Sequence, residues 1–345
     1  MRNVIEIQRK IAPEVVEIIE CRYEILRHIR YAQPVGRRAL AALLKMSERV
    51  LRAQVEFLRE TGLVNFSPLG MAVSDAGEAL LPQLTDYVKL LRGLAVQEDE
   101  LAKRLGLKRV LILPGDADCD ETAKRELGRA AANLLGDYLT GDKIVAVSGG
   151  SMMAAVADQM AVKAPGTLVV PARGGLGDRL EYQANSVAAV MAQHVGGSYR
   201  QLYVPDSVSE ETLAGILAED DQVKAVVTIL KQADIVVHGV GEMRKMAKRR
   251  RLKENVLAEI KALGAVGEAL GQYCALDGRV VYVTHSVGLL LHDLSNISLV
   301  IAVAGGASKA EAILSVMRAG QQHVLVTDEA AAQGMLRKLD ELDVN

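Results

Sequence analysis

The chain has 345 residues, half of them hydrophobic, and a net charge of −2, which predicts two domains with buried cores. No apolar run is long enough to span a bilayer, and the charged start MRNVIEIQRK lacks the apolar stretch of a secretory signal. We therefore expect a cytoplasmic protein with no membrane partner. Cys21, Cys119 and Cys274 lie far apart, which indicates buried free thiols rather than disulfides or a metal site.

Positive charge is concentrated near the start of the chain. Between Arg22 and Glu60, nine Arg and Lys residues stand against four Glu, a local net charge of +5. Such basicity in an otherwise acidic protein indicates a nucleic-acid surface. Tryptophan is absent and only two phenylalanines occur, which argues against a stacking platform for single-stranded nucleic acid.

The same region has the pattern of a small helical domain. Apolar residues at helical spacing predict a helix over residues 14–31, which Pro34 and Gly36 end. A short helix follows at 36–46, and Ser47 caps a third at 47–62. The sequence LVNFSPLGMAVSDAG then predicts two short strands around a turn. Three helices, with the short turn LKMS before the third, and a hairpin are typical of a winged helix-turn-helix.

The third helix is the one expected to read DNA. Arg49 and Arg52 lie three residues apart near its N-terminal end, so they project from one face, and arginine can bind guanine with two hydrogen bonds. The alternative is a solvated surface with ordinary ion pairs. The apolar side is predicted to consist of Val50, Leu51, Val55, Phe57 and Leu58. The candidate DNA contacts are Arg37, Arg38, Ser47, Arg49 and Arg52.

Residues 75–107 are predicted to form a linker or oligomerisation helix. Its leucines and valines recur at near-heptad spacing, which suits pairing with a second copy in a dimer; packing against its own domain is the alternative. These residues are Leu80, Leu81, Leu84, Val88 and Leu91. The predicted domains are therefore residues 1–74, which bind DNA, the linker at 75–107, and an effector domain at 108–345.

From Lys108 onward, short apolar runs alternate with helical segments. This alternation predicts an α/β, doubly wound, mostly parallel Rossmann-like domain, whose ligand binds beyond the carboxyl ends of the strands. A single helical stretch is expected from Glu210 to Leu230. The predicted strands are RVLILPG, KIVAVSGG, TLVVPARGG, YRQLYVP, ADIVVHGVG, VVYVTHSVG, LVIAVAGG and HVLVTD.

Four predicted strand ends carry glycines or cations. Gly149 and Gly150 open a helix whose backbone N–H groups favour an anion, although neither a P-loop nor a GxGxxG pattern is present and a Gly-Gly turn can simply change direction. Arg173 can bind a phosphate through two nitrogens. The four cations 248–251 form a phosphate clamp or a solvated face. Lys309 opposes a helix dipole, which indicates an anion. Two separate basic loops suit a ligand with two phosphates.

The histidines give only weak support to a catalytic function. His194, His238, His285 and His292 are spread without metal-ligand spacing, and no nucleophile elbow occurs. His238 and His285 lie at strand ends, where they are candidate bases; ordinary structural histidines are the alternative. We predict no catalytic residue and no metal.

Several segments together resemble the SorC-type, sugar-phosphate-responsive bacterial transcriptional regulators over nearly the whole chain. They are QPVGRRALAALLKMSERVLRAQVEFLRETGLV, PARGGLGD, VHGVGEM, THSVG and IAVAGGASKAEAI. The resemblance implies a repressor of glycolytic genes that binds double-stranded operator DNA as a homo-oligomer, a dimer or a tetramer. It also implies a sugar-phosphate effector, fructose-1,6-bisphosphate, and no catalytic cofactor.

The effector domain of that family is similar to glucosamine-6-phosphate deaminases, ribose-5-phosphate isomerases and 6-phosphogluconolactonases. The family often has threonines where Ser151 and Met152 stand, so one hydroxyl contact is lost while backbone N–H contacts remain. The GxGxDGHxA-type loop of the enzymes is absent, which favours sensing and leaves a sugar-phosphate isomerase or deaminase as the second hypothesis. The resemblance implies that Gly149, Gly150, Ser151, Met152 and Lys309 line one phosphate site, and that Arg173, Gln183, Arg249 or Arg250, and Glu268 hold the rest of the ligand.

Overall fold

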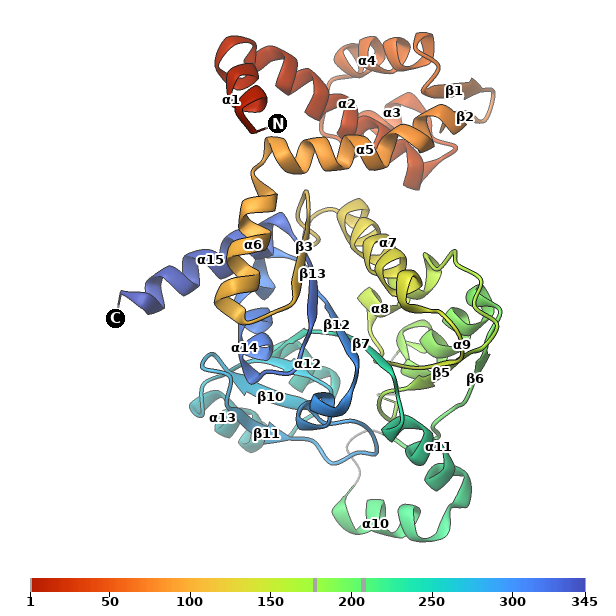
Figure 1. Ribbon diagram of the computed structural model, residues 1–345, viewed down its shortest axis with the longest axis vertical. Coiled ribbons are helices and arrows are strands. Elements are labelled where there is room, and N and C mark those ends of the chain that lie inside the picture. Colours follow the sequence, from red (N-terminus) through yellow and green to blue (C-terminus); the bar gives the residue numbers. More distant parts are fainter. Residues whose placement is uncertain (1, 176–178, 206–208, 345) are drawn as a thin grey trace. The chain divides into compact units, whose positions relative to one another are not determined.

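The three helices and the hairpin predicted before residue 75 are present in the computed structural model, which describes residues 2–175, 179–205 and 209–344 (Figure 1). An additional helix precedes them. The chain divides into two compact units, Met1–Val96 and Gln97–Asn345. The first contains α1 (Arg2–Ile11), α2 (Pro13–Ala32), α3 (Arg37–Leu43), α4 (Glu48–Glu60), β1 (Val64–Ser67), β2 (Gly70–Val73) and α5 (Asp75–Leu91).

One main core holds the first unit together, beside a smaller apolar cluster at Val16 and Leu91. Leu51, Val55 and Leu58 of α4 are buried in the main core with residues of α2 and α3. Val50 and Phe57 are 41% exposed, so the prediction that they belong to the apolar side is wrong. Only the stripe at i, i+4 and i+7 of this helix faces the core, and both residues lie beside that stripe. The two strands form an antiparallel hairpin, and Val35 pairs with Met71 beside it.

Residues 75–107 form two helices, not one. The first is α5, and α6 spans Leu94–Leu105. Gly93 separates them with a φ of +67°, a conformation that ends a helix and that glycine adopts without a steric penalty. Leu81 and Val88 of α5 are buried in the core of the first unit. Of the two alternatives for this apolar face, the structure shows packing against its own domain.

The second unit is built on a seven-stranded parallel sheet, which confirms the predicted α/β class. Its strand order is β3-β13-β12-β7-β4-β5-β6, and every pair is parallel. The strands are β3 (Arg109–Leu113), β4 (Lys143–Val147), β5 (Thr167–Pro171), β6 (Ser198–Tyr199), β7 (Ile235–Gly239), β12 (Leu299–Val303) and β13 (Val324–Asp328).

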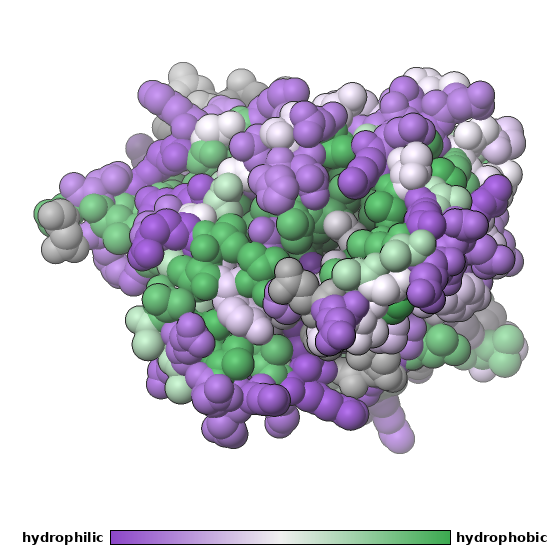
Figure 2. Space-filling view, turned by 90° about the horizontal axis from the view of Figure 1, so that it is seen from below, coloured by the Kyte–Doolittle hydropathy of each residue, from purple (hydrophilic) through white to green (hydrophobic). Residues whose placement is uncertain are grey.

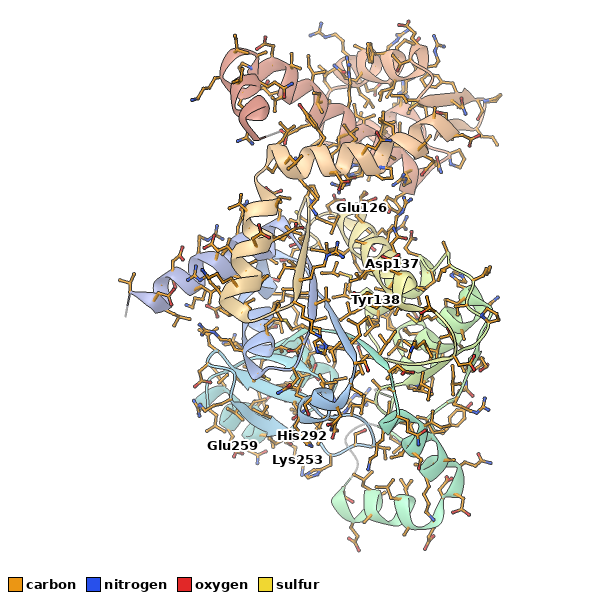
Figure 3. The ribbon with its side chains drawn as sticks, viewed as in Figure 1. Glu126, Asp137, Tyr138, Lys253, Glu259 and His292 are labelled. Carbon is orange, nitrogen blue, oxygen red and sulfur yellow. The ribbon has the colours of Figure 1, made fainter. Side chains whose placement is uncertain are left out.

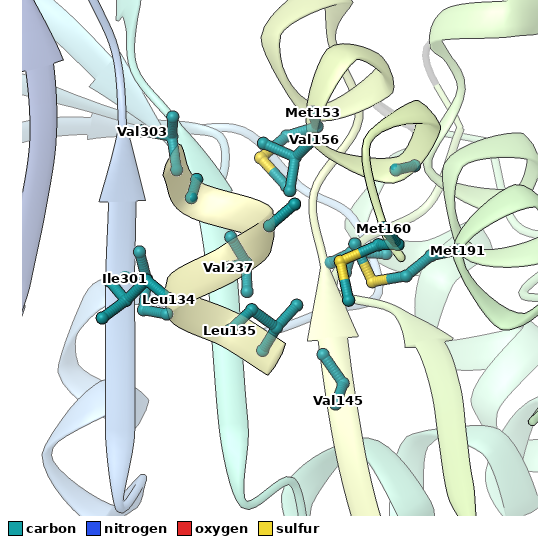
Figure 4. Close-up of a cluster of buried hydrophobic side chains, with 14 of the residues drawn as sticks. Leu134, Leu135, Val145, Met153, Val156, Met160, Met191, Val237, Ile301 and Val303 are labelled. Atoms are coloured by element: carbon teal, nitrogen blue, oxygen red, sulfur yellow. The ribbon is translucent and has the colours of Figure 1, made fainter. Parts of the chain in front are cut away.

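Helices cover both faces of this sheet. On one face lie α7 (Glu121–Tyr138), α8 (Ser151–Asp158) and α9 (Ala184–Val195), whose apolar residues share a core with Val145, Val237 and Ile301 (Figure 4). The connections that contain α7, α8 and α9 all run in one direction along the sheet, from β3 toward β6. The connections that contain α11 (Asp221–Lys231) and α14 (Ala310–Ala319) run in the other direction. Because such connections are right-handed, α11 and α14 lie on the other face. The last helix, α15 (Glu329–Asp343), packs against α14 and β13.

A second, antiparallel sheet lies in the long connection between β7 and β12, where the sequence patterns predicted only one strand. It has the order β11-β10-β9-β8. The predicted strand VVYVTHSVG forms β11 here rather than joining the parallel sheet, because the chain returns through tight turns. The elements of this connection are β8 (Gly241–Glu242), α12 (Met243–Arg249), α13 (Glu254–Ala262), β9 (Ala265–Ala269), β10 (Gln272–Ala275), β11 (Val280–Val283) and the 3₁₀ helix η2 (Leu291–Asn296).

Three smaller predictions were wrong in detail. The stretch Glu210–Leu230 is two helices, α10 (Glu210–Glu219) and α11, because the side chain of Asp220 accepts the N–H groups of Gln222 and Val223 and starts a new helix. Within YRQLYVP, only Tyr199 belongs to a strand, β6. Cys119 is exposed and outside any disulfide, contrary to the prediction that the thiols are buried, whereas Cys274 is buried.

No helix within the described ranges is both long and apolar enough to cross a membrane.

Candidate functional site

A cavity of about 230 Å³ opens at the carboxyl ends of β4, β5 and β7. The chain leaves β4 toward α8 on one face of the sheet, whereas it leaves the neighbouring β7 toward the other face. The cavity therefore lies at a topological switch point, where parallel sheets bind ligands. All ten residues expected at the effector site line it: Gly149, Gly150, Ser151, Met152, Arg173, Gln183, Arg249, Arg250, Glu268 and Lys309.

The start of α8 contributes backbone donors to this cavity. No side chain caps this helix, and its first turn leaves N–H groups without intrahelical acceptors. Gly150 precedes it with a φ of +115°, a conformation that favours glycine. A Cβ atom on Gly149 would lie 2.6 Å from the carbonyl oxygen of Tyr182, so the close approach of that segment also needs glycine. The side chain of Met152 is buried in the core, which leaves its N–H as its polar group at the site.

Lys309 places an ammonium group in the same cavity. It ends the 3₁₀ turn η3 (Ala307–Lys309), just before α14, and its ammonium group has no hydrogen-bond or ion-pair partner in the described part of the chain. Burial lowers the pKa of this lysine below its ordinary value, and nearby Lys245 and Lys124 also lower the pKa, while Asp118 and Asp328 raise it. Lys309 is only partly buried, and a partly buried charge without a partner is stabilised when an anion binds beside it.

Carboxylates already occupy the helix start next to Lys309. Asp328 Oδ2 accepts the N–H of Gly306 at 2.7 Å, and Asp118 Oδ2 accepts that of Ser308 at 2.7 Å. Asp116 Oδ1 accepts the N–H of Ala307 at 3.2 Å. These charges offset the helix dipole, so the position of Lys309 at a helix start does not by itself indicate an anion. The indication comes from its burial within the cavity and from the absence of a partner.

Cations on α12 form another side of the cavity. Of the run 248–251, only Arg249 and Arg250 line it; Lys248 and Arg251 are exposed elsewhere. Lys245, which the sequence analysis missed, lines the cavity with Arg249 because residues four apart share one face of a helix. Helical spacing was the signal that would have identified it, but this segment was interpreted as a loop.

Two further contributors come from the segment before α9. Arg179 and Tyr182 line the cavity, with the guanidinium carbon of Arg179 5.6 Å from the centre of the tyrosine ring. Leu176, Gly177 and Asp178 of the motif PARGGLGD lie outside the described residues. Charged side chains at the cavity comprise six cations and two carboxylates among the described residues: Arg173, Arg179, Lys245, Arg249, Arg250 and Lys309, with Glu242 and Glu268. This surplus of positive charge suits an anionic ligand.

Not all of these charges are directed at a ligand. Arg250 Nη2 donates to Glu268 Oε1 at 2.8 Å, and both side chains are almost fully buried. Arg173 donates through Nη1 to the carbonyl oxygen of Leu270 and through Nη2 to that of Thr284. These three predicted site residues therefore form a hydrogen-bonded wall of the cavity, unlike Lys309 and Lys245.

The candidate bases lie outside the cavity. No histidine is found among its described lining residues. His238 is fully buried in β7, where burial lowers its pKa and its Nδ1 contacts the carbonyl oxygen of Gly239. His285 is exposed, and His292 lies on η2, facing away from the sheet (Figure 3). The second hypothesis, an isomerase or deaminase, depended on His238 or His285 as a base, and neither is placed for that role.

The candidate DNA contacts gather on α3 and at the start of α4. Ser47 caps α4 by accepting the N–H of Val50 at 3.3 Å. Arg49 and Arg52 follow within one turn, and both are exposed. Arg38 is exposed as well and lies 3.5 Å from Glu48. Within the described residues, Arg37, Arg49 and Arg52 have no ion-pair partner, so their charges are available to a phosphate or a base.

Tertiary contacts separate these cations from the other basic residues of the segment. The guanidinium carbon of Arg22 lies 3.5 Å from the ring centre of Phe57. Arg27 is buried and pairs with Glu24, and Arg30 pairs with Glu78 at 2.6 Å. The cations of α2 therefore stabilise the unit itself, and the exposed cations between residues 22 and 60 lie on α3, on α4 and, at Lys45, in the turn between them.

Comparison with known proteins gives matches to both units. A family model described as the CggR N-terminal DNA binding domain matches residues 18–88, and a sugar-binding domain model matches residues 91–337. The chain is 43% identical over 340 residues to a central glycolytic genes regulator of Priestia megaterium, an alignment that covers 98% of this chain and 99% of the relative. The protein of that name from Bacillus subtilis is also 43% identical, with the same coverage.

Solved structures match in the same way. A SorC family transcriptional regulator from Enterococcus faecalis aligns with a TM-score of 0.65 and 38% identity, over 70% of this chain and 99% of its own. The full-length sorbitol operon regulator SorC from Klebsiella pneumoniae aligns with a TM-score of 0.65 over 92% of this chain and 98% of its own. At 17% identity, this second likeness concerns the fold alone.

Proposed function

The chain belongs to the bacterial transcriptional regulators that join a CggR-type DNA-binding domain to a sugar-binding domain, and we propose that it is a repressor of glycolytic genes with fructose-1,6-bisphosphate as its effector. The relatives are regulators rather than enzymes, and the domains bind DNA and a small-molecule sugar. The identity of the sugar, the repressing direction and the target genes are the proposed part.

The distribution of anion-binding groups in the cavity carries this proposal. The uncapped start of α8 and the unpaired ammonium of Lys309 suit one phosphate. Lys245 and Arg249 on α12, with Arg179, suit a second phosphate. Gln183 supplies an amide group that can bind sugar hydroxyls between them. Glu268 accepts from Arg250 and Gly271 through one carboxylate oxygen, and its other oxygen can accept from a sugar hydroxyl. A sugar with two phosphates fills both phosphate sites and also bonds to the groups between them. A neutral sugar can bond only to the groups between the two phosphate sites.

On the DNA side, α4 is proposed as the recognition helix. Its N-terminal turn carries Arg49 and Arg52, which can reach base edges in a major groove, while Arg37 and Arg38 on α3 contact backbone phosphates. The effector changes operator affinity only to the extent that it binds the two conformations of the protein differently. We propose that bound fructose-1,6-bisphosphate favours the conformation with weaker operator binding.

Operator binding as a homo-oligomer, a dimer or a tetramer, is part of the same proposal. Figure 2 shows apolar side chains gathered between hydrophilic ones on the face of the molecule seen from below. Exposed apolar residues of the second unit include Leu263, Val280 and Val283, and such surface is often covered by a second subunit. Sedimentation velocity over a range of protein concentrations measures the oligomeric state directly.

The test of this function is operator affinity at fixed salt, because protein–DNA affinities depend steeply on salt concentration. A duplex selected by the protein from a random pool serves as the operator. We expect its Kd to rise at least tenfold with saturating fructose-1,6-bisphosphate and to stay constant with unphosphorylated fructose. An operator affinity that no glycolytic sugar phosphate changes would contradict the proposal.

A further inference from the structure

We propose that Thr284 is a positioning residue for the effector: its hydroxyl group fixes the guanidinium groups of Arg173 and Arg250 at the wall of the cavity. The inference rests on the proposed function, since it concerns the sugar-bisphosphate site. Thr284 follows β11 and is 3% exposed. It is not among the residues that line the cavity, so any effect on the ligand passes through the two arginines, which do line it.

The hydrogen bonds of Thr284 use the full capacity of its hydroxyl. Arg173 Nη2 and Arg250 Nη1 both donate to Oγ1, the second over 3.2 Å. The hydroxyl in turn donates to the carbonyl oxygen of Gly271 at 3.0 Å. Because a hydroxyl group donates once and accepts twice, all three positions are occupied. One side chain thus links two cationic groups, in addition to the bonds of Arg173 to the carbonyl oxygens of Leu270 and Thr284 and the bond of Arg250 to Glu268.

These bonds also join three parts of the fold at the cavity. Arg173 follows β5 of the parallel sheet, Arg250 follows α12, and Thr284 follows the antiparallel strand β11. The antiparallel sheet is an insertion between β7 and β12, and the segment that follows it pairs with the segment after β5 through an antiparallel bridge between Arg173 and Gly288. The hydroxyl of Thr284 supplies a link there, and Glu268 strengthens it by accepting from Arg250 Nη2.

The turn at Gly271 holds the other side of the Arg173 guanidinium. Gly271 has a φ of +76°, and a Cβ atom on it would lie 2.0 Å from Cζ of Arg173. The guanidinium is therefore packed against this turn and cannot move toward it. Without the hydroxyl of Thr284, Arg173 Nη2 would keep only the backbone carbonyl oxygen of Thr284, and Arg250 Nη1 would lose its acceptor there. A buried N–H of each arginine would then face an apolar methyl group.

The experiment compares Thr284→Val, which keeps the shape of the side chain and removes the oxygen, with Thr284→Ser, which keeps the oxygen. Calorimetry measures the Kd of the full-length protein for fructose-1,6-bisphosphate and for inorganic phosphate. We expect Thr284→Val to weaken the bisphosphate at least tenfold and to leave inorganic phosphate within threefold, because the α8 site does not involve Thr284. Thr284→Ser should bind both ligands within threefold of the wild type.

A bisphosphate Kd that is unchanged in Thr284→Val would overturn the positioning role, as would an equal loss in Thr284→Ser. Equal weakening of both ligands would show a general loss of structure instead and would also overturn it. If Thr284→Val does not fold, Thr284→Ala removes the same oxygen without placing a methyl group against the arginines and is read in the same way. Absence of bisphosphate binding by the wild type is a separate result, which contradicts the proposed function itself.

Discussion

The surroundings of Lys309 disfavour the charged form of its side chain. Burial and the neighbouring lysines lower its pKa, and no carboxylate or other acceptor within the described residues pairs with its ammonium group. In a protein without a ligand, such a group reduces stability. When a phosphate binds beside it, the same charge forms a charge-assisted hydrogen bond. The same unpaired ammonium group therefore lowers the stability of the free protein and raises its affinity for an anion.

Replacing Lys309 tests whether its ammonium group both binds the effector and destabilises the free protein. Lys309→Met keeps the length and most of the apolar contacts of the side chain, and we expect it to weaken fructose-1,6-bisphosphate about tenfold to a hundredfold, which corresponds to the loss of about 1.5–3 kcal/mol for a hydrogen bond to a charged group. The free protein should be at least as stable as the wild type in thermal unfolding. Lys338→Met, at a lysine that pairs with Glu311 and Glu341 away from the cavity, should leave the Kd unchanged.

The lowered pKa of Lys309 also predicts a pH dependence. An anion binds the protonated lysine, so the affinity for fructose-1,6-bisphosphate should fall as the pH rises through the pKa of the free protein, which lies below the ordinary lysine value. Sugar phosphates are fully ionised in this range because their second pKa lies near 6, as for other phosphate monoesters. Calorimetry between pH 7.5 and 10 measures the trend, which Lys309→Met should lack.

The same shift affects the stability of the free protein with the opposite sign. Between the lowered pKa and the ordinary one, the unfolded chain holds more protons than the folded protein at this residue. The contribution of Lys309 to the free energy of unfolding therefore increases with pH in that window. A saturating ligand, which restores the proton to the folded state, should remove this increase.

At the scale of elements, the site depends on turns that bring helix ends together. The turn before α8 approaches η1 (Leu180–Tyr182) so closely that Gly150 donates its N–H to the carbonyl oxygen of Tyr182 at 2.7 Å. The turn before α14 is held by carboxylates from other loops. Both turns are thus fixed by partners distant in the sequence, and their positions determine the geometry of the cavity.

Gly149→Ala tests the first turn. The new Cβ would overlap backbone atoms of Tyr182 and Ala184, so the segment must move, and we expect a loss of about 1–3 kcal/mol of stability with weaker effector binding. Thermal unfolding and calorimetry measure both. Gly215→Ala in α10 is the matched control: no atom lies within 4 Å of its added Cβ, and alanine stabilises a helix interior by roughly 0.5–1 kcal/mol.

Asp328→Asn tests the second turn. Asp328 accepts the N–H groups of Ala117 and Gly306 with one oxygen and that of Ala331, in the first turn of α15, with the other. Asparagine has a single acceptor oxygen, so at least one buried donor loses its partner at a cost of about 1–3 kcal/mol. This loss should exceed the gain from removing the carboxylate charge, which is unfavourable because burial raises the pKa of Asp328. Asp277→Asn, on the surface, should hardly change Tm; a similar Tm in both variants would refute the assignment.

At the scale of the whole molecule, one unit is proposed to read DNA and the other to bind the effector, so their contributions should be separable. We expect the double variant Arg49→Ala, Arg52→Ala to weaken operator binding by at least tenfold and to reduce its salt dependence if phosphates are contacted. Binding of fructose-1,6-bisphosphate should not change. Fluorescence anisotropy with a labelled duplex measures the first, and calorimetry the second.

Lys10→Ala provides the control for charge alone. Lys10 is exposed on α1, outside the helices assigned to DNA, and its loss changes the net charge of the unit without touching α3 or α4. Operator affinity within twofold of the wild type is expected. If Lys10→Ala were as damaging as the double variant, the affinity would depend on the overall charge, and α4 would not be the recognition helix.

Much of this architecture followed from local patterns. Apolar spacing, the cap at Ser47 and the strand-turn-glycine repeats predicted the helices of the first unit and the parallel sheet of the second, because these signals act within a few residues. The ten effector residues were named from strand ends and from the family resemblance, and the parallel topology brings strand ends to one edge. Of the antiparallel sheet only one strand was predicted, since its strands of two to five residues carry little periodicity.

What the sequence determined by itself was the kind of element at each place and the chemistry available at strand ends, because propensity and periodicity are local properties. Only the tertiary structure decided which charges are free. In the folded chain Arg30 pairs with Glu78, whereas Arg49 is exposed. Lys245 lines the cavity, and Arg173 is hydrogen-bonded to Thr284. Whether a charged group binds a ligand or stabilises the fold depends on its neighbours in space, and the folded chain supplies these from distant positions.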